Sequence, residues 1–287
     1  MNISAGITAF LDVLGFGERV LNAVSDEDVK GIIEHVQLIQ KEFDFKPKDE
    51  SVKEIHAFMK KTVLAFSDSV VVNVPLESSF TRLQGSFDPV MSELSGMALA
   101  QGNCTSDGLF LRGGVDLGWW HRRGQTLVSQ SLVGAYRTEQ NAKVPVIALS
   151  TELYKYLSNH SDRKYYSPDA DPLKILRPFR GLDGTEATAF WYLDYISICA
   201  EGIDWHTSRA QQAQYLSASS DDKERIREEG YVENLRRWFS RHARAVEKAS
   251  GTANSASVKA KYKWLGAYHN EVAVLFTKDP SCECNPK

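Results

Sequence analysis

The chain has 287 residues, of which 43% are hydrophobic and 25% are charged, and its formal net charge is −3. This composition is ordinary for a soluble globular protein, and the small negative charge disfavours general nucleic-acid binding through the phosphate backbone. The four cysteines have neither a zinc spacing nor the pattern of a disulfide framework, and no apolar run approaches the length of a membrane span. We therefore expect a cytoplasmic protein with a small-molecule partner, and neither nucleic acid nor a membrane as a partner.

The first predicted strand, within residues 9–17, carries the carboxylate of Asp12 inside an apolar run and ends in the turn Gly15-Phe16-Gly17. A carboxylate in such a run costs several kcal/mol unless it is paired, and a metal ion is the expected partner. The chain becomes helical at residues 18–21. Strand, glycine turn and helix N-terminus would direct free backbone N–H groups at one place, which suits a phosphate.

A second apolar run, residues 63–72, repeats the pattern and is predicted as a hairpin with Ser67-Asp68-Ser69 at its tip. If the two strands are neighbours, Asp12 and Asp68 meet. Two carboxylates that share a site raise each other's pKa unless a cation lies between them, and oxygen ligands suit Mg²⁺ or Mn²⁺. The combination predicts nucleotide chemistry. Taken singly, each aspartate is as typical of a structural residue, a turn former or a helix cap, as of a metal ligand.

The order of the following elements predicts the fold class. Helical periodicity indicates one or two helices over residues 20–43 and another over 80–101, and a strand is predicted over 110–118. Strand, helix, two-stranded hairpin, helix and strand make up the split βαβ arrangement of a ferredoxin-like or palm core, of the α+β class. The later elements are predicted as a helix at 131–141, an outer strand at 144–149, a short helix from Ser150 and an aromatic strand at 189–195.

The last third of the chain differs in composition. Residues 218–248 alternate acidic and basic side chains on a predicted helix, and a small polar linker at 251–257 precedes a last helix. We expect a domain at residues 1–200 and a helical C-terminal extension at 201–287 that braces the core or a dimer partner. Cys282 and Cys284 lie in a polar tail, where free thiols on a mobile end are favoured over a metal site.

Four segments, in this order, resemble the motifs of the class III nucleotidyl cyclases. Residues 10–16 resemble the family's first metal-binding strand, and residues 66–68 the position of its second metal aspartate. Residues 111–118 resemble the strand that follows, and residues 128–139 the helix that donates transition-state groups across a dimer. The whole chain, including Ala135-Tyr136-x-x-Glu139, is similar to a divergent bacterial branch, the pyrimidine cyclases of the Pycsar anti-phage systems.

The resemblance implies a class III cyclase catalytic domain that acts as a homodimer with active sites shared across the interface. It implies conversion of UTP to 3′,5′-cyclic UMP and pyrophosphate, a signal in anti-phage defence by abortive infection. The choice of UTP over CTP as the expected substrate rests on the resemblance alone. Cyclic CMP made from CTP is the alternative, as is a module that binds nucleotide without turnover. A palm-fold nucleotidyl transferase is a third reading, but the hairpin tip lacks the Gly-Gly-Asp/Glu-Glu-Phe sequence of diguanylate cyclases.

The metal and phosphate ligands follow from the same motifs. Asp12 and Asp68, with the carbonyl of Val13, would hold two divalent ions, Mn²⁺ or Mg²⁺, as in two-metal sites. The amides around Gly15, Phe16 and Gly17 would hold the β- and γ-phosphates.

The resemblance also implies roles for residues outside this cluster. Arg137, from the second subunit, would stabilise the transition state, or else is a solvent-facing helix residue. Leu64 and Thr126 stand where mainstream members carry their base-selecting residues, and neither is a purine selector. The family's transition-state asparagine falls at Val133, so that role is vacant or filled by a neighbour. Arg112 is expected to brace a nearby carboxylate.

Overall fold

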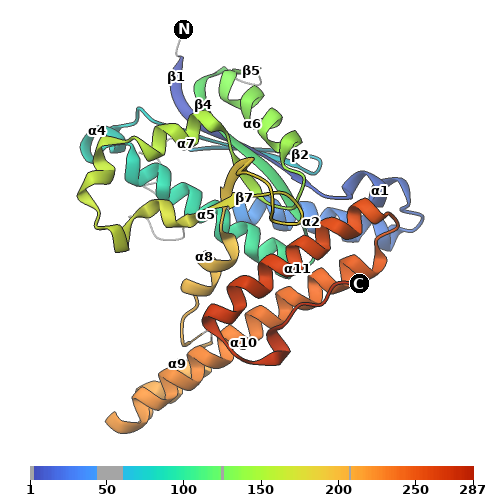
Figure 1. Ribbon diagram of the computed structural model, residues 1–287, viewed down its shortest axis with the longest axis vertical. Helices are drawn as coiled ribbons and strands as arrows, with labels where there is room; N and C mark the ends of the chain where they lie inside the picture. Colours follow the sequence, from blue (N-terminus) through green and yellow to red (C-terminus); the bar gives the residue numbers. More distant parts are fainter. Residues whose placement is uncertain (1–2, 44–60, 124–125, 207) are drawn as a thin grey trace. The chain divides into compact units, whose positions relative to one another are not determined.

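The computed structural model describes residues 3–43, 61–123, 126–206 and 208–287 (Figure 1). The chain divides into two compact units, Met1–Cys104 with Leu109–Asp194, and Thr105–Gly108 with Tyr195–Lys287. Among the described helices, none combines the length and apolar character that crossing a bilayer requires.

The described strands of the first unit form one mixed sheet. Its first four strands are β1 (Ser4–Val13), β2 (Thr62–Phe66), β3 (Ser69–Pro75) and β4 (Leu111–Arg123). They are ordered β2-β3-β1-β4, with every neighbouring pair antiparallel, which is the strand order of a split βαβ ferredoxin-like core. The predicted α+β, ferredoxin-like class with C-terminal helices is therefore confirmed.

The sheet continues beyond this core. Next to β4 lies the parallel strand β6 (Ile147–Leu149), followed by β8 (Phe190–Leu193) and β7 (Leu176–Phe179), both in antiparallel pairs. The short strand β5 (Thr126–Ser129) pairs with the far end of β4. The helices of this unit are α1 (Phe16–Leu21), α2 (Asp26–Phe43), α4 (Ser79–Gln84), α5 (Phe87–Ser106), α6 (Gln130–Asn141) and α7 (Thr151–Ser158). Short 3-10 turns follow at Ser161–Tyr165, Pro168–Ala170 and Pro172–Ile175.

The two faces of β1 differ in chemistry because successive side chains of a strand point to opposite sides. One face is apolar and fully buried, and it consists of Ile7, Ala9, Leu11 and Val13. The other carries Thr8, Phe10 and Asp12, whose cross-strand partners on β4 are Asp116, Gly114 and Arg112. This second face holds the candidate site.

Helix α6 packs on that second face. A buried chain of hydrogen bonds runs from Asn73 Nδ2 to Thr8 Oγ1 (3.0 Å) and from Thr8 to the Ser131 hydroxyl (2.6 Å), which in turn bonds Ser129 (2.9 Å). The backbone of α6 lies directly over β4 at Gly114, where a methyl group would be 2.1 Å from the carbonyl oxygen of Ala135. The glycine of β4 thus sets how closely the helix approaches the sheet.

We expect Gly114→Ala to destabilise the protein by about 3 kcal/mol, at the upper end of overpacking costs, because neither backbone can yield without moving α6. The matched control is Gly31→Ala in the middle of α2, where a methyl group meets nothing within 4 Å. That variant should gain about 0.5–1 kcal/mol from helix propensity. Urea unfolding measures both, and a Gly114→Ala variant as stable as the wild type would contradict the packing described here.

The second unit is helical. It contains α8 (Tyr195–Glu201), α9 (Arg209–Ser217), α10 (Ser220–Thr252), α11 (Ala256–Phe276) and the 3-10 turn η4 (Pro280–Cys282). Helices α10 and α11 pack against each other, and η4 contacts α10. Figure 1 shows the two long helices side by side, in orange and red.

The prediction that the C-terminal cysteines lie on a mobile end is wrong. Both thiols are free, but Cys282 and Cys284 are 1% and 2% exposed. The polar tail is ordered because side chains of α10 and α11 bond its backbone, as the Asn270 side chain does with both the N–H and the carbonyl of Cys284. These partners are distant in sequence, so the composition of the tail alone did not reveal them.

Candidate functional site

The end of β1 and the tip of the β2–β3 hairpin lie together. Asp12 is the second-last residue of β1, and Asp68 lies in the turn that joins β2 to β3. Strand β3 pairs with β1 so that Val70 is opposite Leu11, which brings the hairpin tip beside the end of β1. The two half-buried carboxyl groups are close enough to share a hydrogen bond.

The electrostatics of this pair favour the binding of a cation. The pKa of the Asp12 carboxyl is raised to about 6, mainly by burial and further by the neighbouring Asp68 and Glu139, while the Arg112 guanidinium opposes the rise. A carboxyl held in this way is relieved by a cation. The structure therefore places two carboxyl groups side by side, where a bound cation would stabilise the ionised form of Asp12.

The donors of this site fit a hard divalent cation. Two carboxylates and a backbone carbonyl at Val13 would all supply oxygen, which Mg²⁺ and Mn²⁺ prefer. Within the described residues, no group of three or more His, Cys, Asp or Glu side chains is arranged to hold a metal ion. The remaining ligands would have to be water or the phosphates of a substrate.

Arg112 and Glu139 form a buried ion pair beside Asp12. Arg112 is the cross-strand partner of Asp12, and its guanidinium bonds the carboxylate of Glu139 on α6, which is fully buried. Among the described residues, nothing accepts a hydrogen bond from the buried Nε of Arg112. Arg112 thus braces a carboxylate, as expected. The sequence reasoning did not identify Glu139 as the partner, although it belongs with Ser131 and Ala135 to the buried, helically spaced stripe of α6.

The predicted phosphate-binding turn follows β1 directly. Gly15 has φ of 77°, a left-handed conformation that favours glycine, and it precedes α1, which begins at Phe16 rather than at residue 18. Phe16 is buried, whereas Gly15 and Gly17 are exposed, and a methyl group on either glycine would meet nothing within 4 Å. The backbone of this turn is therefore open to a ligand.

Arg137 and Val133 lie on the outer side of α6. Both are exposed, and they are four residues apart on one face of the helix, away from the stripe that contains Glu139. Arg137 makes no ion pair with any residue in the described ranges. The guanidinium of Arg137 thus does not pair with Asp12 or Asp68 of its own chain. Because it is exposed, it can contact another molecule.

The two positions assigned to base selection are separate within one chain. Leu64 lies in the middle of β2 and is half-buried, whereas Thr126 is the exposed first residue of β5. Strand β2 pairs with β3, and β5 pairs with β4, so these residues are not neighbours in the sheet.

We expect Asp12→Asn to raise the thermal midpoint of the metal-free protein at about pH 8 by about 2–4 °C, equivalent to about 1 kcal/mol once solvent screening of this half-buried group is allowed for. The folded pKa of about 6 exceeds the ordinary value of 3.8, so ionisation costs stability as pH rises through this interval, and the cost persists above it. The gain should vanish at about pH 4, and Mn²⁺ should stabilise the wild type but not the variant. A variant that is less stable than the wild type in chelator would contradict the charge repulsion.

Comparisons with known proteins give fold neighbours only. No protein-family model and no curated protein matches the chain. A class III adenylyl cyclase-like ATP-binding protein from Pseudomonas aeruginosa is 11% identical, with a TM-score of 0.41 over 97% of this chain and 73% of that chain. The guanylate cyclase domain of RhGC from Catenaria anguillulae, in complex with GTP, is 14% identical, with a TM-score of 0.36 over 67% of this chain and 98% of that chain.

A bacterial light-regulated adenylyl cyclase is 13% identical, with a TM-score of 0.35 over 55% of this chain and 82% of that chain. Values this low do not assign the chain to a family. The functional assignment therefore depends on the residues described above.

Proposed function

We propose that this chain is a nucleotidyl cyclase of the class III type, with residues 1–200 as its catalytic domain. The observation that carries the proposal is the pair of carboxyls at Asp12 and Asp68, with the raised pKa of Asp12, beside the open turn Gly15–Gly17. In this proposal, one end of β1 provides oxygen ligands for a cation and, next to them, the exposed backbone of the Gly15–Gly17 turn for phosphate. A triphosphate bound through divalent ions needs both features.

In this proposal Asp12 and Asp68, with the carbonyl of Val13, bind the ions, and the amides around Phe16 bind the β- and γ-phosphates. Divalent ions held there would lower the pKa of the ribose 3′-hydroxyl and neutralise charge on the leaving group. The 3′-oxygen would attack the α-phosphorus in line, its proton would pass to solvent water, and the bond between the α-phosphorus and the pyrophosphate leaving group would break. Asp12 lies near the end of β1, and Asp68 lies in the turn between β2 and β3. Because β1 pairs with β3, the sheet would hold the two carboxylates in fixed positions around the reacting groups.

Arg137 is proposed to act on the site of a second copy of the chain in a homodimer. Its exposure on the outer face of α6 supports this role, since its guanidinium makes no ion pair with the described residues of its own chain. There it would spread charge from the transition state, as an arginine finger does. Active sites shared in this way require dimerisation for turnover.

The proposed substrate is a pyrimidine triphosphate, with UTP preferred over CTP, and the product a cyclic nucleotide that serves as a signal in anti-phage defence. This preference comes from the sequence resemblance to the Pycsar cyclases. It is supported by the side chains at the base-selecting positions: Leu64 stands where purine-specific members carry an acid or a lysine, and Thr126 where they carry an aspartate or a cysteine.

A second candidate, a cyclase-like module that binds nucleotide without turnover, is favoured by one observation. The position of the family's transition-state asparagine is Val133, which is apolar and 52% exposed. Divalent-dependent release of pyrophosphate separates the two candidates. The proposed cyclase releases pyrophosphate from UTP or CTP in Mn²⁺ and stops when a chelator is added, whereas the binding module protects the protein against heat without releasing any.

A further inference from the structure

An arginine lies directly opposite the first of the two aspartates, yet its ion pair is with another residue. Arg112 on β4 and Asp12 on β1 are cross-strand partners in an antiparallel pair. Side chains in such positions share one face of the sheet, with Cβ atoms about 4.5–5.5 Å apart, and opposite charges there attract each other. Arg112 is nevertheless paired with Glu139 of α6 and not with Asp12.

The close approach of α6 to the sheet brings Glu139 to Arg112. Gly114 lies two residues after Arg112 on the same face of β4, and a methyl group on this glycine would be 2.5 Å from the backbone nitrogen of Glu139. The carboxylate of Glu139 is fully buried. One of its oxygens accepts a hydrogen bond from the side-chain amide of Gln140 (2.5 Å), and the other faces the guanidinium. Glu139 is thus fixed where it competes with Asp12 for the arginine.

The guanidinium is not fully satisfied by Glu139. Among the described residues, no acceptor meets the buried Nε of Arg112. An unpaired buried donor costs free energy, so this group would gain from a further acceptor. The carboxyl of Asp12 is an acceptor directly across the strand pair. Glu139 therefore holds a guanidinium that has a second partner within reach of its own strand pair.

We propose that Glu139 is a positioning residue for the cation site: it holds the guanidinium of Arg112 against α6, prevents it from pairing with Asp12, and so leaves the Asp12 carboxylate free for a divalent ion. The inference rests on the cation site of the proposed function. Without Glu139, the charge of Arg112 would occupy Asp12, and an ion would have to displace it. Glu139 acts through Arg112 and does not need to touch the ion.

The first test reads the sign of a stability change and needs no metal. In the wild type, Asp12→Asn should raise the thermal midpoint in chelator at about pH 8, because it removes a half-buried charge beside Asp68. In Glu139→Met, which offers no acceptor, Arg112 would turn to Asp12. The same Asp12→Asn change should then lower the midpoint by about 2–4 °C, because it removes the new partner of the arginine.

Glu139→Met itself should fold, because Asp12 replaces the lost partner of Arg112. The matched control is Glu93→Met, which breaks another part-buried ion pair of the same unit, between Glu93 of α5 and Lys61 (2.7 Å). That pair involves neither Arg112 nor Asp12. In the Glu93→Met background, Asp12→Asn should therefore still raise the thermal midpoint.

The second test measures Mn²⁺ binding from the electron paramagnetic resonance signal of the free ion. Glu139→Met should bind Mn²⁺ about 10–100-fold more weakly than the wild type, the usual effect of losing a group that orients a metal ligand. The double variant Arg112→Met/Glu139→Met should regain the wild-type affinity, because the competing charge is gone. Replacing both partners of a buried ion pair by apolar side chains is often tolerated. Glu93→Met should bind Mn²⁺ as the wild type does.

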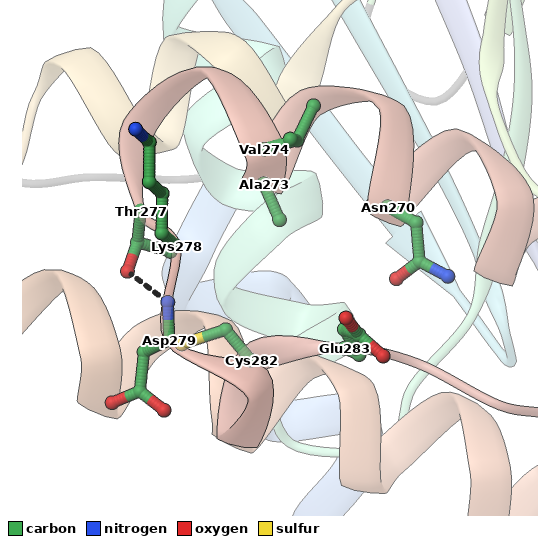
Figure 2. A pocket seen from close by; sticks show the side chains of 8 residues that line it. All are labelled: Asn270, Ala273, Val274, Thr277, Lys278, Asp279, Cys282 and Glu283. Atoms are coloured by element: carbon green, nitrogen blue, oxygen red, sulfur yellow. Dashed lines mark hydrogen bonds between the residues drawn. The ribbon is translucent and has the colours of Figure 1, made fainter.

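Carboxylates of the second unit would also take up Mn²⁺, and their share has to be separated. Figure 2 shows Asp279 and Glu283 among the residues that line a pocket of about 430 Å³ between the last turn of α11 and the C-terminal tail. This volume has room for a hydrated ion. Asp12→Asn keeps the pocket, so the binding that it retains is the background for every titration.

The outcomes distinguish this inference from the proposed function. A wild-type protein that binds no more Mn²⁺ than Asp12→Asn would contradict the cation site itself, and with it both proposals. Where the wild type does bind Mn²⁺, four results would each overturn the role of Glu139 alone. They are a Glu139→Met variant that does not fold, an unreversed effect of Asp12→Asn in that background, undiminished Mn²⁺ binding by Glu139→Met, and weak or absent binding by the double variant.

Discussion

Asp68→Ala is expected to lower pyrophosphate release from UTP or CTP in Mn²⁺ by about three orders of magnitude or more, the loss that several kcal/mol of metal-assisted stabilisation implies. Asp68 lies at a hairpin tip and is half-buried, so its removal leaves the sheet intact. It also relieves the repulsion at Asp12 that raises the pKa of that carboxyl. Activity should therefore fall while the thermal midpoint of the metal-free protein stays the same or rises.

This combination distinguishes a lost ligand from a lost fold. The matched control is Asp183→Ala, which removes an exposed loop carboxylate that bonds only Thr185 in the described structure and should leave turnover unchanged. Substantial turnover by Asp68→Ala would exclude Asp68 as a metal ligand. Loss of both activity and thermal stability would instead indicate a structural role for the hairpin tip.

Arg137→Ala is the second change with a large expected effect. If the guanidinium stabilises charge in the transition state as an arginine finger does, turnover should fall by about three to five orders of magnitude. The residue is exposed on α6 and makes no ion pair with the described residues, so the fold should be unaffected. A merely solvent-facing arginine would cost less than about tenfold, within the usual effect of a surface substitution.

Mixing two inactive variants tests where Arg137 acts. In a dimer of Asp68→Ala with Arg137→Ala, one site contains both substitutions if the arginine comes from the partner, and the other site is intact. Activity should therefore return when the two inactive proteins are mixed and allowed to exchange subunits. If Arg137 serves its own chain, each site carries one substitution and the mixture stays inactive.

The position of the two aspartates was predictable because local signals determined it. The alternating apolar residues of β1, the hairpin of β2 and β3, and the helix between them define a split βαβ order, and that order alone brings the end of β1 to the hairpin tip. The glycine turn after β1 was evident from Gly15 and Gly17, although α1 begins two residues earlier than expected.

Other features depended on contacts between distant residues. Strand β7, Leu176–Phe179, was not predicted, since it is four residues long and contains Pro178. In the sequence, Glu139 is typical of a surface residue on a helix. In the structure its side chain is buried and pairs with Arg112 of β4. The C-terminal tail has the polar composition of a mobile end, and its order comes from side chains of α10 and α11 such as Asn270.

The central claim, that the carboxylates of Asp12 and Asp68 support cyclisation of a nucleoside triphosphate, is tested most directly by product analysis. The purified protein is incubated with ATP, GTP, CTP and UTP separately in Mn²⁺, with Asp12→Ala as the control, and the products are identified by mass. The account predicts a 3′,5′-cyclic pyrimidine monophosphate and pyrophosphate, with UTP the preferred substrate, and neither product from the control. A cyclic purine nucleotide would contradict the substrate assignment, and a product that persists in Asp12→Ala would contradict the site itself.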